Sequence, residues 1–501
     1  MATESQAEAT AGELERGLLG QIEVHSIDWI PDPERHGKTW QQTMLWFLGN
    51  FQYFTIPIGF VGPSLGLSLG WSILAGALGI WFGTLFMAFH ATQGPVFGLP
   101  QMIQTRAQLG YRGVVVALFA VLFTYMAFNV ADQVLMASGL HGAFGWSAVA
   151  IITAVLAAAL AIFGYDWVHR VFRFLLVISF PCYAIISVAI LAGHAGGVTP
   201  HHPGGFIFTA FMAQFSVAAA YNITYAPYVS DYSRYMPRKT SPGGIIAAVF
   251  FGASGSAIWL IALGAWLATR LGVSDGLVGL QRVGDNVAAP LGSITAFLSA
   301  TALLATMGMN AYGGMLTVLT GIDSFKKIRT SRIWRAATVI VLAVVWYAIG
   351  AGISTSASNT AVSAVLNSLT LMLYLLVPWT ALNLVDFFFV RHGRYAITDI
   401  FRPDGAYRVW GWRGLTAYFA GFVAEIPFMV LPPIAGLSYT GYFPSHLTNG
   451  VDYSWLVGLA VSGLVYLLLS RSLNVAAEQS AIDASERELR AIDVAAEAAG
   501  T

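Results

Sequence analysis

Long apolar runs alternate with short polar segments along almost the whole chain. A run of about 20 predominantly apolar residues can cross a bilayer as a single helix, and twelve runs of this kind are present. We expect them at residues 43–68, 70–92, 113–140, 146–166, 171–193, 207–230, 243–269, 291–321, 334–354, 360–389, 414–437 and 453–470. The pattern therefore predicts an all-α integral membrane protein with twelve transmembrane helices.

Two of these runs are interrupted in their middle. The sixth contains SVAAAYNITYAPYVSDYSRYMP at 216–237, where Pro227 removes a backbone donor and disfavours helical geometry in the residue before it. The first carries amides at membrane depth and is then broken by Pro57 and Pro63. In lipid, freed backbone groups are tolerated only where protein or a water-filled cavity satisfies them. Both breaks thus predict a binding site; the plainer alternative is that Pro and Gly are common in membrane helices.

Interruptions in the first and sixth spans point to an inverted repeat of five plus five helices, with the substrate near the membrane midplane. The predicted organisation is an N-terminal tail (1–40), a first repeat (41–195), a second repeat (206–390), a loop (391–413), two further helices (414–470) and a C-terminal tail (471–501). This last tail is expected to be either a helix or a disordered end.

Polar residues in the third and eighth spans supply candidate chemistry. Tyr125, Asn129 and Asp132 are spaced by four and three residues, which places them on one face of a helix. A tyrosine ring offers a stacking surface, and an asparagine offers a donor and an acceptor. A carboxyl within the membrane is by default a functional hypothesis, so Asp132 could carry a coupling proton or be a hydrogen-bonded structural residue. Asn310 could bind a substrate edge or hold helices together, and Thr306 lies one turn before it.

Composition and charge support the membrane assignment. Of 501 residues, 56% are hydrophobic and only 10% are charged, against about 25% in a typical soluble chain. Mean hydropathy is +0.67. With the N-terminus inside, all but Arg270 and Arg282 of the 25 Lys and Arg residues fall in inner segments. We therefore expect a multi-pass protein of the cell membrane with both termini in the cytoplasm.

Other classes of protein find little support. The ten histidines form no metal-ligand pattern, and no nucleophile–base arrangement argues for an enzyme. No cofactor and no nucleic-acid partner are expected; the partners are the lipid bilayer and a small-molecule substrate. Asp231 and Arg234, at the inner end of the sixth span, are either part of an inner gate or a plain interfacial ion pair.

Several long motifs occur in order along the chain: IDWIPDPERHG, GPVFGLPQMIQTRAQLGYRG, GYDWVHRVFR, YAPYVSDYSRYMP, NLVDFFFVRHGRY and FRPDGAY. Through them the chain, from about Ile27 to Leu469, resembles the nucleobase–cation symporter-one family, in its purine–cytosine permease branch. The resemblance implies the leucine-transporter-type fold, in which a ten-helix inverted repeat is followed by two peripheral helices. It also implies a flat heterocycle held between helices 1, 3, 6 and 8.

Position by position, the resemblance places the family's substrate groups on residues of the two interrupted spans and of the third and eighth spans. These are Gln52 on helix 1, Tyr125 and Asn129 on helix 3, Tyr225 on helix 6 and Asn310 on helix 8. The full set of candidate substrate-binding residues is Phe51, Gln52, Tyr125, Asn129, Tyr221, Asn222, Tyr225 and Asn310.

Two departures from the family pattern matter. Tyrosine stands in place of tryptophan on both helix 3 (Tyr125) and helix 6 (Tyr225), which leaves the identity of the heterocycle open. Sodium-coupled relatives have two adjacent hydroxyls on helix 8, whereas this chain has Thr306 and Met307. Together with Asp132, this difference favours a proton over sodium as the coupling ion.

The predicted function is import of a purine or cytosine-type nucleobase by proton symport, with alternating access. Within the transporter class, the alternatives are hydantoin, allantoin, uracil or a vitamin-like heterocycle. From another class, the chain could be a passive channel or a membrane substrate sensor, and uphill accumulation of substrate would separate a symporter from both.

Overall fold

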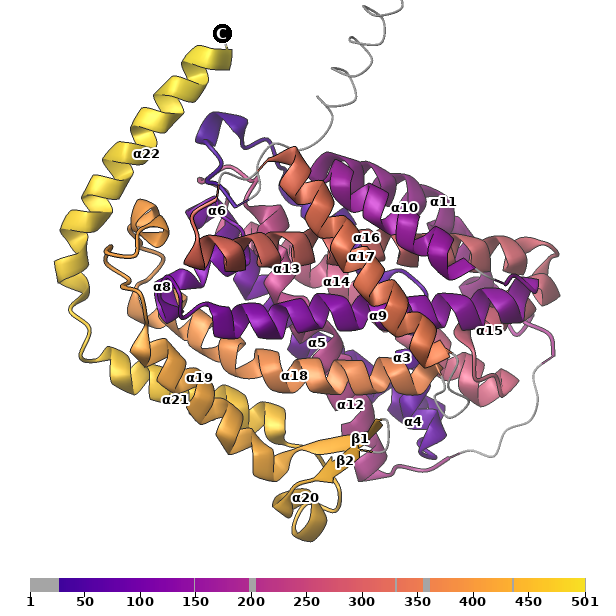
Figure 1. The fold of residues 1–501 in the computed structure, drawn as a ribbon. Coiled ribbons are helices and arrows are strands. Elements are labelled where there is room, and N and C mark those ends of the chain that lie inside the picture. The colour runs from indigo at the N-terminus through magenta and orange to yellow at the C-terminus, as the bar shows by residue number, and fades with distance from the viewer. Residues whose placement is uncertain are drawn as a thin grey trace, which may run out of the picture.

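The computed structural model describes residues 27–147, 149–197, 204–328, 331–354, 361–434 and 437–500. Residues 1–26 of the predicted N-terminal tail lie outside this set. The long helices run side by side, with α8 (Arg106–Leu109) and α22 (Gln479–Gly500) at one end and α15 (Gly276–Val287) at the other (Figure 1). We call the end with α8 and α22 the terminal face; residues 27–38 also lie there. We call the end with α15 the distal face.

Two groups of helices each pack mainly on their own members. The first, called the bundle, comprises α2 (Thr39–Asn50), α3 (Thr55–Ile58), α4 (Val61–Ser64), α5 (Leu69–Ala91), α12 (Phe208–Ile223), α13 (Ala226–Ser233) and α14 (Pro242–Trp266). The second, called the scaffold, comprises α9 (Val115–Phe144), α10 (Val149–Phe163), α16 (Leu291–Phe325) and α17 (Arg332–Ser354). A Cβ on Gly83 would lie 2.2 Å from the Ala219 carbonyl oxygen, so α5 and α12 touch backbone to backbone.

The predicted breaks in the first and sixth spans are present. Helix α2 ends at Asn50 and α3 begins at Thr55, while α12 ends at Ile223 and α13 begins at Ala226. The two breaks are joined, because Nδ2 of Asn50 donates to Oδ1 of Asn222 over 2.9 Å and to the Ala253 carbonyl over 2.9 Å. These amides satisfy polar groups that a lipid environment would leave without partners.

The remaining elements flank the bundle and the scaffold. The helices are α6 (Gln93–Phe97), α7 (Gln101–Gln104), α11 (Tyr165–Leu191), α18 (Ala361–Val385), α19 (Trp412–Glu425), α20 (Tyr442–His446) and α21 (Ser454–Ser470). The shorter helical turns are η1 (Asp32–Glu34), η2 (Leu267–Leu271), η3 (Asp386–Val390), η4 (Ile397–Phe401), η5 (Ile426–Phe428) and η6 (Val475–Glu478). Helix α18 packs against α9 on one side and α21 on the other, and α19 and α21 pack together.

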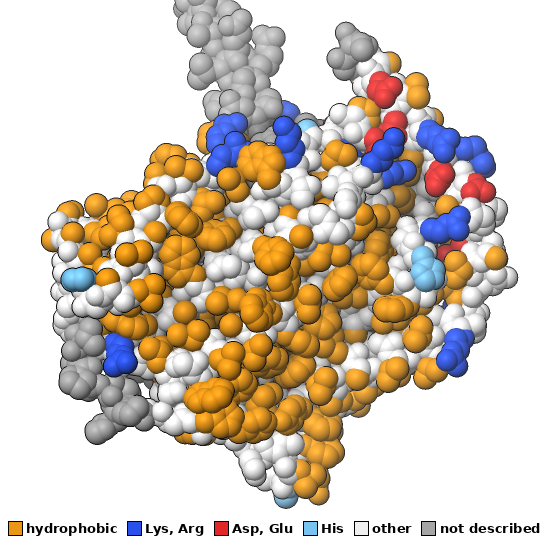
Figure 2. All heavy atoms as spheres, turned by 180° about the vertical axis from the view of Figure 1, so that it is seen from behind, with side chains coloured by type: hydrophobic (Ala, Val, Ile, Leu, Met, Phe, Trp, Pro, Cys, Tyr) orange, Lys and Arg blue, Asp and Glu red, His pale blue; other side chains and the backbone are white. Residues whose placement is uncertain are grey.

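Seven helices of the described residues are long and apolar enough to cross a membrane. They are Leu69–Phe97, Val115–Phe144, Arg170–Leu191, Pro242–Leu271, Leu291–Phe325, Arg332–Ile353 and Val365–Val390. An eighth would be the pair Ser454–Ser470 and Val475–Ala498, which is bent by 76°. Hydrophobic side chains cover the broad middle of the molecule, while many of the charged ones gather towards the end that carries α22 (Figure 2). The protein is thus a multi-pass membrane protein whose described residues are all-helical apart from one small hairpin.

That hairpin corrects the predicted eleventh span, 414–437. Helix α19 ends at Glu425, and the chain continues through η5 into two antiparallel strands, β1 (Val430–Ile434) and β2 (Leu437–Thr440), with Val430 paired to Thr440. Pro427 and the two prolines of β1 explain the change, because proline cannot donate a helical hydrogen bond and clashes with the preceding turn. Of the two alternatives for the C-terminal tail, the structure has the helix, α22.

Candidate functional site

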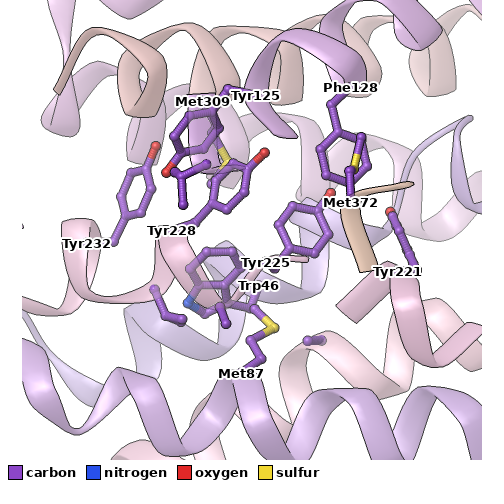
Figure 3. Close-up of a cluster of buried hydrophobic side chains, with 14 of the residues drawn as sticks. Trp46, Met87, Tyr125, Phe128, Tyr221, Tyr225, Tyr228, Tyr232, Met309 and Met372 are labelled. Atoms are coloured by element: carbon purple, nitrogen blue, oxygen red, sulfur yellow. The ribbon is translucent and has the colours of Figure 1, made fainter. Parts of the chain in front are cut away.

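Five aromatic rings meet where the bundle touches the scaffold (Figure 3). Tyr225, at the break between α12 and α13, stacks on Phe128 of α9 with ring centroids 5.7 Å apart and an interplanar angle of 14°. Its ring also meets Tyr221 at 5.4 Å and Tyr228 at 5.1 Å. Tyr125 of α9 meets Tyr228 edge-on at 4.4 Å. All five side chains are buried, and we call them the aromatic cluster.

A chain of amides lies against this cluster. Nδ2 of Asn310 on α16 donates to Oδ1 of Asn129 over 2.8 Å and to Oδ2 of Asp132 over 3.3 Å. Asn129 in turn donates from Nδ2 to the Met307 carbonyl over 3.2 Å. The hydroxyl of Tyr228 donates to Oδ1 of Asn310 over 2.8 Å. The bundle and the scaffold are therefore joined through a hydrogen-bond network that includes a buried carboxyl.

The first break contributes a second set of polar contacts. Nε2 of Gln52 donates to the Tyr221 hydroxyl over 3.0 Å, and the Thr55 hydroxyl lies 2.8 Å from the same oxygen. The Tyr225 hydroxyl donates to the Gly49 carbonyl over 3.3 Å. The carbonyls and amides exposed by the two breaks thus surround the aromatic cluster from the bundle side.

Six of the eight predicted substrate residues come together in this way, and two do not. Phe51 packs among other rings, with its centroid 4.6 Å from Tyr183 and 5.2 Å from Trp259. Asn222 faces α5 and α2, donating to the Thr84 hydroxyl over 2.6 Å while it accepts from Asn50. The Thr306 hydroxyl donates to the Ala302 carbonyl of its own helix over 3.2 Å.

Two cluster members were absent from the predicted set, namely Phe128 and Tyr228. Both follow a predicted aromatic residue by three positions, since Phe128 follows Tyr125 and Tyr228 follows Tyr225. Residues three apart on a helix share a face. This spacing was the signal that could have found them.

A cavity of about 910 Å³ opens on the distal face, next to the cluster. Tyr53, His141 and Asp275 are among its lining residues. Tyr53 donates from its hydroxyl to Oδ2 of Asp275 over 2.9 Å, and Ser138 reaches the same oxygen at 3.3 Å. The chain neighbours of Tyr53 belong to the site, because Gln52 bonds Tyr221 and Phe54 stacks on Tyr221 at 5.5 Å. The broken first span therefore contacts both the cavity, through Tyr53, and the cluster, through Gln52 and Phe54.

The terminal face is closed around buried arginines instead. Nη2 of Arg106 lies 3.0 Å from Oδ2 of Asp323, and burial lowers the pKa of this guanidinium while Asp323 opposes the shift. Arg234 donates to the Tyr312 hydroxyl over 3.1 Å and to the backbone carbonyl of Asp231 over 3.2 Å. The carboxylate of Asp231 accepts from the Gln101 backbone N–H at 2.9 Å. The two predicted gate residues thus tie α13 to α7 and α16.

The segment before the first span and η6, the turn before the C-terminal helix, extend this closure. Arg35 donates to the Pro95 carbonyl over 2.8 Å, and burial lowers its pKa to about 10 against the effect of Asp32. Arg391 pairs with Asp386 and with Glu478, at 3.0 Å from the latter. Burial alone would lower the pKa of Arg391, but these carboxylates raise it overall.

Solved transporter structures share this fold. Mhp1, described as a nucleobase-cation-symport-1 family transporter in a closed conformation with bromovinylhydantoin bound, matches with a TM-score of 0.68 at 17% identity, over 91% of this chain and 98% of its own. A Na⁺-coupled sialic acid symporter matches with a TM-score of 0.56 at 11% identity, over 88% and 91%. The fold is therefore that of a multi-pass membrane protein of the leucine-transporter type.

The family follows from the sequence. A family model described as "Permease for cytosine/purines, uracil, thiamine, allantoin" matches residues 29–458. The chain therefore belongs to the nucleobase–cation symport-1 family, as its motifs predicted, and it is a transporter rather than an enzyme. The Bacillus subtilis protein YxlA, whose name places it among the purine-cytosine permeases, is 32% identical over 90% of this chain and 96% of its own. The Saccharomyces cerevisiae purine-cytosine permease FCY21 is 24% identical over 53% and 52%.

Proposed function

We propose that this protein is a secondary active transporter that imports a purine or cytosine-type nucleobase together with a proton, by alternating access. The observation that carries the proposal is the hydrogen-bonded set of Asn129, Asn310 and Asp132 beside the aromatic cluster, in a chain of this family. A flat ring suits stacking between aromatic faces. Amides that pair with its edge discriminate strongly, because a wrong ligand leaves buried polar groups without partners.

The proposed coupling ion is a proton, carried by Asp132. This carboxyl is 1% exposed and accepts a hydrogen bond from Asn310, which we assign to substrate binding. The charge of Asp132 and the bound substrate therefore both act on Asn310. An intramembrane carboxyl is costly to keep and therefore marks a functional position. On α16 the Thr306 hydroxyl is engaged within its own helix, and Met307 has no hydroxyl to offer sodium.

The proposed topology has twelve spans, in two inverted repeats of five and a final pair, with the terminal face in the cytoplasm. The two joined breaks support the repeat, because broken helices in corresponding positions surround the binding site in such folds. The charge distribution supports the orientation, since Lys and Arg concentrate on cytoplasmic segments. In this arrangement Asp231 and Arg234 belong to the inner gate, and the distal cavity is the entry path.

Uptake into proteoliposomes tests the proposal. Labelled cytosine, adenine and hypoxanthine are offered under a proton gradient alone and then under a sodium gradient alone. We expect accumulation against the concentration gradient with protons only. Accumulation with sodium only would contradict the coupling assignment, and no uptake of any base would move the substrate to the hydantoin, allantoin or vitamin side of the family. Equilibration without accumulation would identify a passive channel, and binding without uptake a sensor.

The role of Asp132 has a separate test. Asp132→Asn keeps the size and the hydrogen-bonding edge but cannot release a proton. We expect the variant to exchange base across the membrane yet fail to accumulate it under a proton gradient. Accumulation equal to that of the wild type would exclude Asp132 as the proton carrier.

A further inference from the structure

A row of aromatic rings continues from the aromatic cluster towards the terminal face. Trp46 of α2 meets Tyr225 at a centroid distance of 6.0 Å and Tyr232 of α13 at 5.9 Å, and Figure 3 shows Trp46 next to Tyr225. Tyr232 in turn meets Tyr312 of α16, again at 5.9 Å. Trp46, Tyr232 and Tyr312 are at most 1% exposed, and we call these three residues the aromatic ladder.

The ladder leads from the aromatic cluster to the residues that close the terminal face. On α13, Tyr232 lies about one helical turn beyond Tyr228 and directly before the end of the helix, where Arg234 follows. Arg234 donates to the Tyr312 hydroxyl over 3.1 Å. On α16, Tyr312 follows Asn310 of the candidate site by two residues. The row of rings therefore joins the candidate base site to the proposed inner gate.

One contact of the ladder crosses from the bundle to the scaffold. Trp46 and Tyr232 lie on bundle helices. Tyr312 lies on a scaffold helix, and Arg335 of α17 lies over its ring, with Cζ 5.8 Å from the ring centroid. Alternating access in folds of this type moves one group of helices against the other around a fixed site. A path that opens between bundle and scaffold on the terminal side is therefore bordered by Tyr232 on one wall and Tyr312 on the other.

We propose that the aromatic ladder is a second, transient subsite for the base, on which the base stacks as it leaves the candidate site towards the terminal face. Aromatic side chains stack on every base, because each base has a π-face. A base that moves between Tyr232 and Tyr312 regains the kind of contact that it gives up at Tyr225, which lowers the barrier to release. This inference rests on the proposed function, since it takes the aromatic cluster as the base site and the terminal face as the cytoplasmic side.

Two substitutions at Tyr312 separate the role of the ring from that of the hydroxyl. Tyr312→Phe and Tyr312→Leu both remove the oxygen that accepts from Arg234, so a role in the gate alone predicts the same transport rate for both variants. Only Tyr312→Leu removes the aromatic ring. We expect Tyr312→Leu to transport at least about fivefold more slowly than Tyr312→Phe, which corresponds to the loss of one stacking contact.

A second pair and a control pair complete the set. Tyr232→Phe and Tyr232→Leu test the other wall of the path in the same way, and they decide the outcome if a Tyr312 variant does not fold. The control pair is Tyr183→Phe and Tyr183→Leu, because Tyr183 is an equally buried ring that donates to Ser299 over 2.6 Å and packs on Phe51, outside the ladder. The two control variants should transport at the same rate.

The experiment measures uptake of labelled cytosine, adenine and hypoxanthine at saturating concentration by the full-length wild type and the six variants in proteoliposomes. Equilibrium affinity for the same base and the thermal unfolding midpoint are measured beside it. A slower leucine variant in each ladder pair that folds, with a smaller change in affinity and no difference within the control pair, supports the inference.

Three results would overturn the inference and leave the base site itself standing. They are equal transport rates within the ladder pairs, a fall in affinity as large as the fall in rate, and an equal slowing within the control pair. A wild type that takes up none of the three bases would overturn the proposed function, and this inference with it.

Discussion

The two faces of the molecule are closed in different ways. On the terminal face, Arg35, Arg106 and Arg391 are buried and held by carbonyls and carboxylates from segments far apart in the sequence. On the distal face, a cavity of about 910 Å³ is lined by Tyr53, whose hydroxyl donates to Asp275. The terminal face thus holds several buried charged contacts, whereas the distal face is hollowed beside the Tyr53–Asp275 hydrogen bond. We therefore expect the distal side to open more easily.

The contrast has a physical basis in what each contact costs to break. Separating a buried ion pair leaves charges without partners, which costs about 3–5 kcal/mol. The hydroxyl of Tyr53 makes one hydrogen bond to a carboxylate, which contributes about 1.5–3 kcal/mol at most. In the proposed alternating-access cycle, the stronger closure must also open. We propose that binding of the base and the proton between bundle and scaffold supplies that energy.

The largest expected effect comes from breaking the terminal closure. Arg106→Ala leaves Asp323 buried without its cation. We expect the free energy of unfolding to fall by about 3–5 kcal/mol, which a marked fall of the thermal unfolding midpoint in detergent would show. The double change Arg106→Met with Asp323→Leu should recover much of this loss, because an apolar pair leaves no charge unpaired. The matched control is Arg490→Ala, since Arg490 and Glu486 form an exposed pair at 3.7 Å. Equal unfolding midpoints for Arg106→Ala and Arg490→Ala would show that the buried pairs of the terminal face are no stronger than exposed ones.

A smaller effect should follow from loosening the distal layer. Tyr53→Phe removes the hydroxyl that donates to Asp275. If the closed conformation loses about 1 kcal/mol relative to the open one, the population of the open conformation rises roughly fivefold. Val134, which lines the same cavity and is 6% exposed, can report this opening as Val134→Cys in a Cys182→Ser background. An impermeant maleimide should then label Val134→Cys about fivefold faster when Tyr53 is replaced. An unchanged labelling rate would show that Tyr53 does not restrain the distal side.

The smallest effect is expected at the exposed edge of the terminal face. Arg402 and Glu488 pair at 2.9 Å, but both side chains are about half exposed. Exposed pairs contribute about 0–1 kcal/mol, so Glu488→Ala should change the unfolding midpoint and base uptake little. A loss of uptake as large as that of Arg106→Ala would mean that α22 controls the cycle, and the ranking of the contacts would be wrong.

The sequence predicted the parts of this arrangement that depend on local pattern. Apolar runs located the helices, Pro227 located the break in the sixth span, and the spacing of Tyr125 and Asn129 placed them on one face. Asn129 contacts Asn310, which the family resemblance had also placed among the candidate substrate residues. These residues were predictable because placing an amide or an interrupted helix within a membrane costs free energy unless other groups satisfy its hydrogen bonds.

Features that depend on which helices meet were not predictable in this way. Asn222 looked like a substrate residue, but its partner Asn50 lies 172 residues away, and only the packing of the two breaks joins them. Arg106 counted as one more loop charge, yet it is fully buried against Asp323. The hairpin after Glu425 lies in a stretch as apolar as a helix, and its prolines were given too little weight.

The central claim is that the nucleobase binds among Asn129, Asn310 and the aromatic cluster, where the bundle meets the scaffold. The most direct test is equilibrium binding of labelled base to the wild type and to Asn310→Ala and Asn129→Ala, with Thr301→Ala, a hydroxyl that bonds within its own helix, as the matched control on α16. We expect each amide variant to bind at least about tenfold more weakly and the control to bind like the wild type. Unchanged affinity in both amide variants would place the substrate elsewhere and contradict the account.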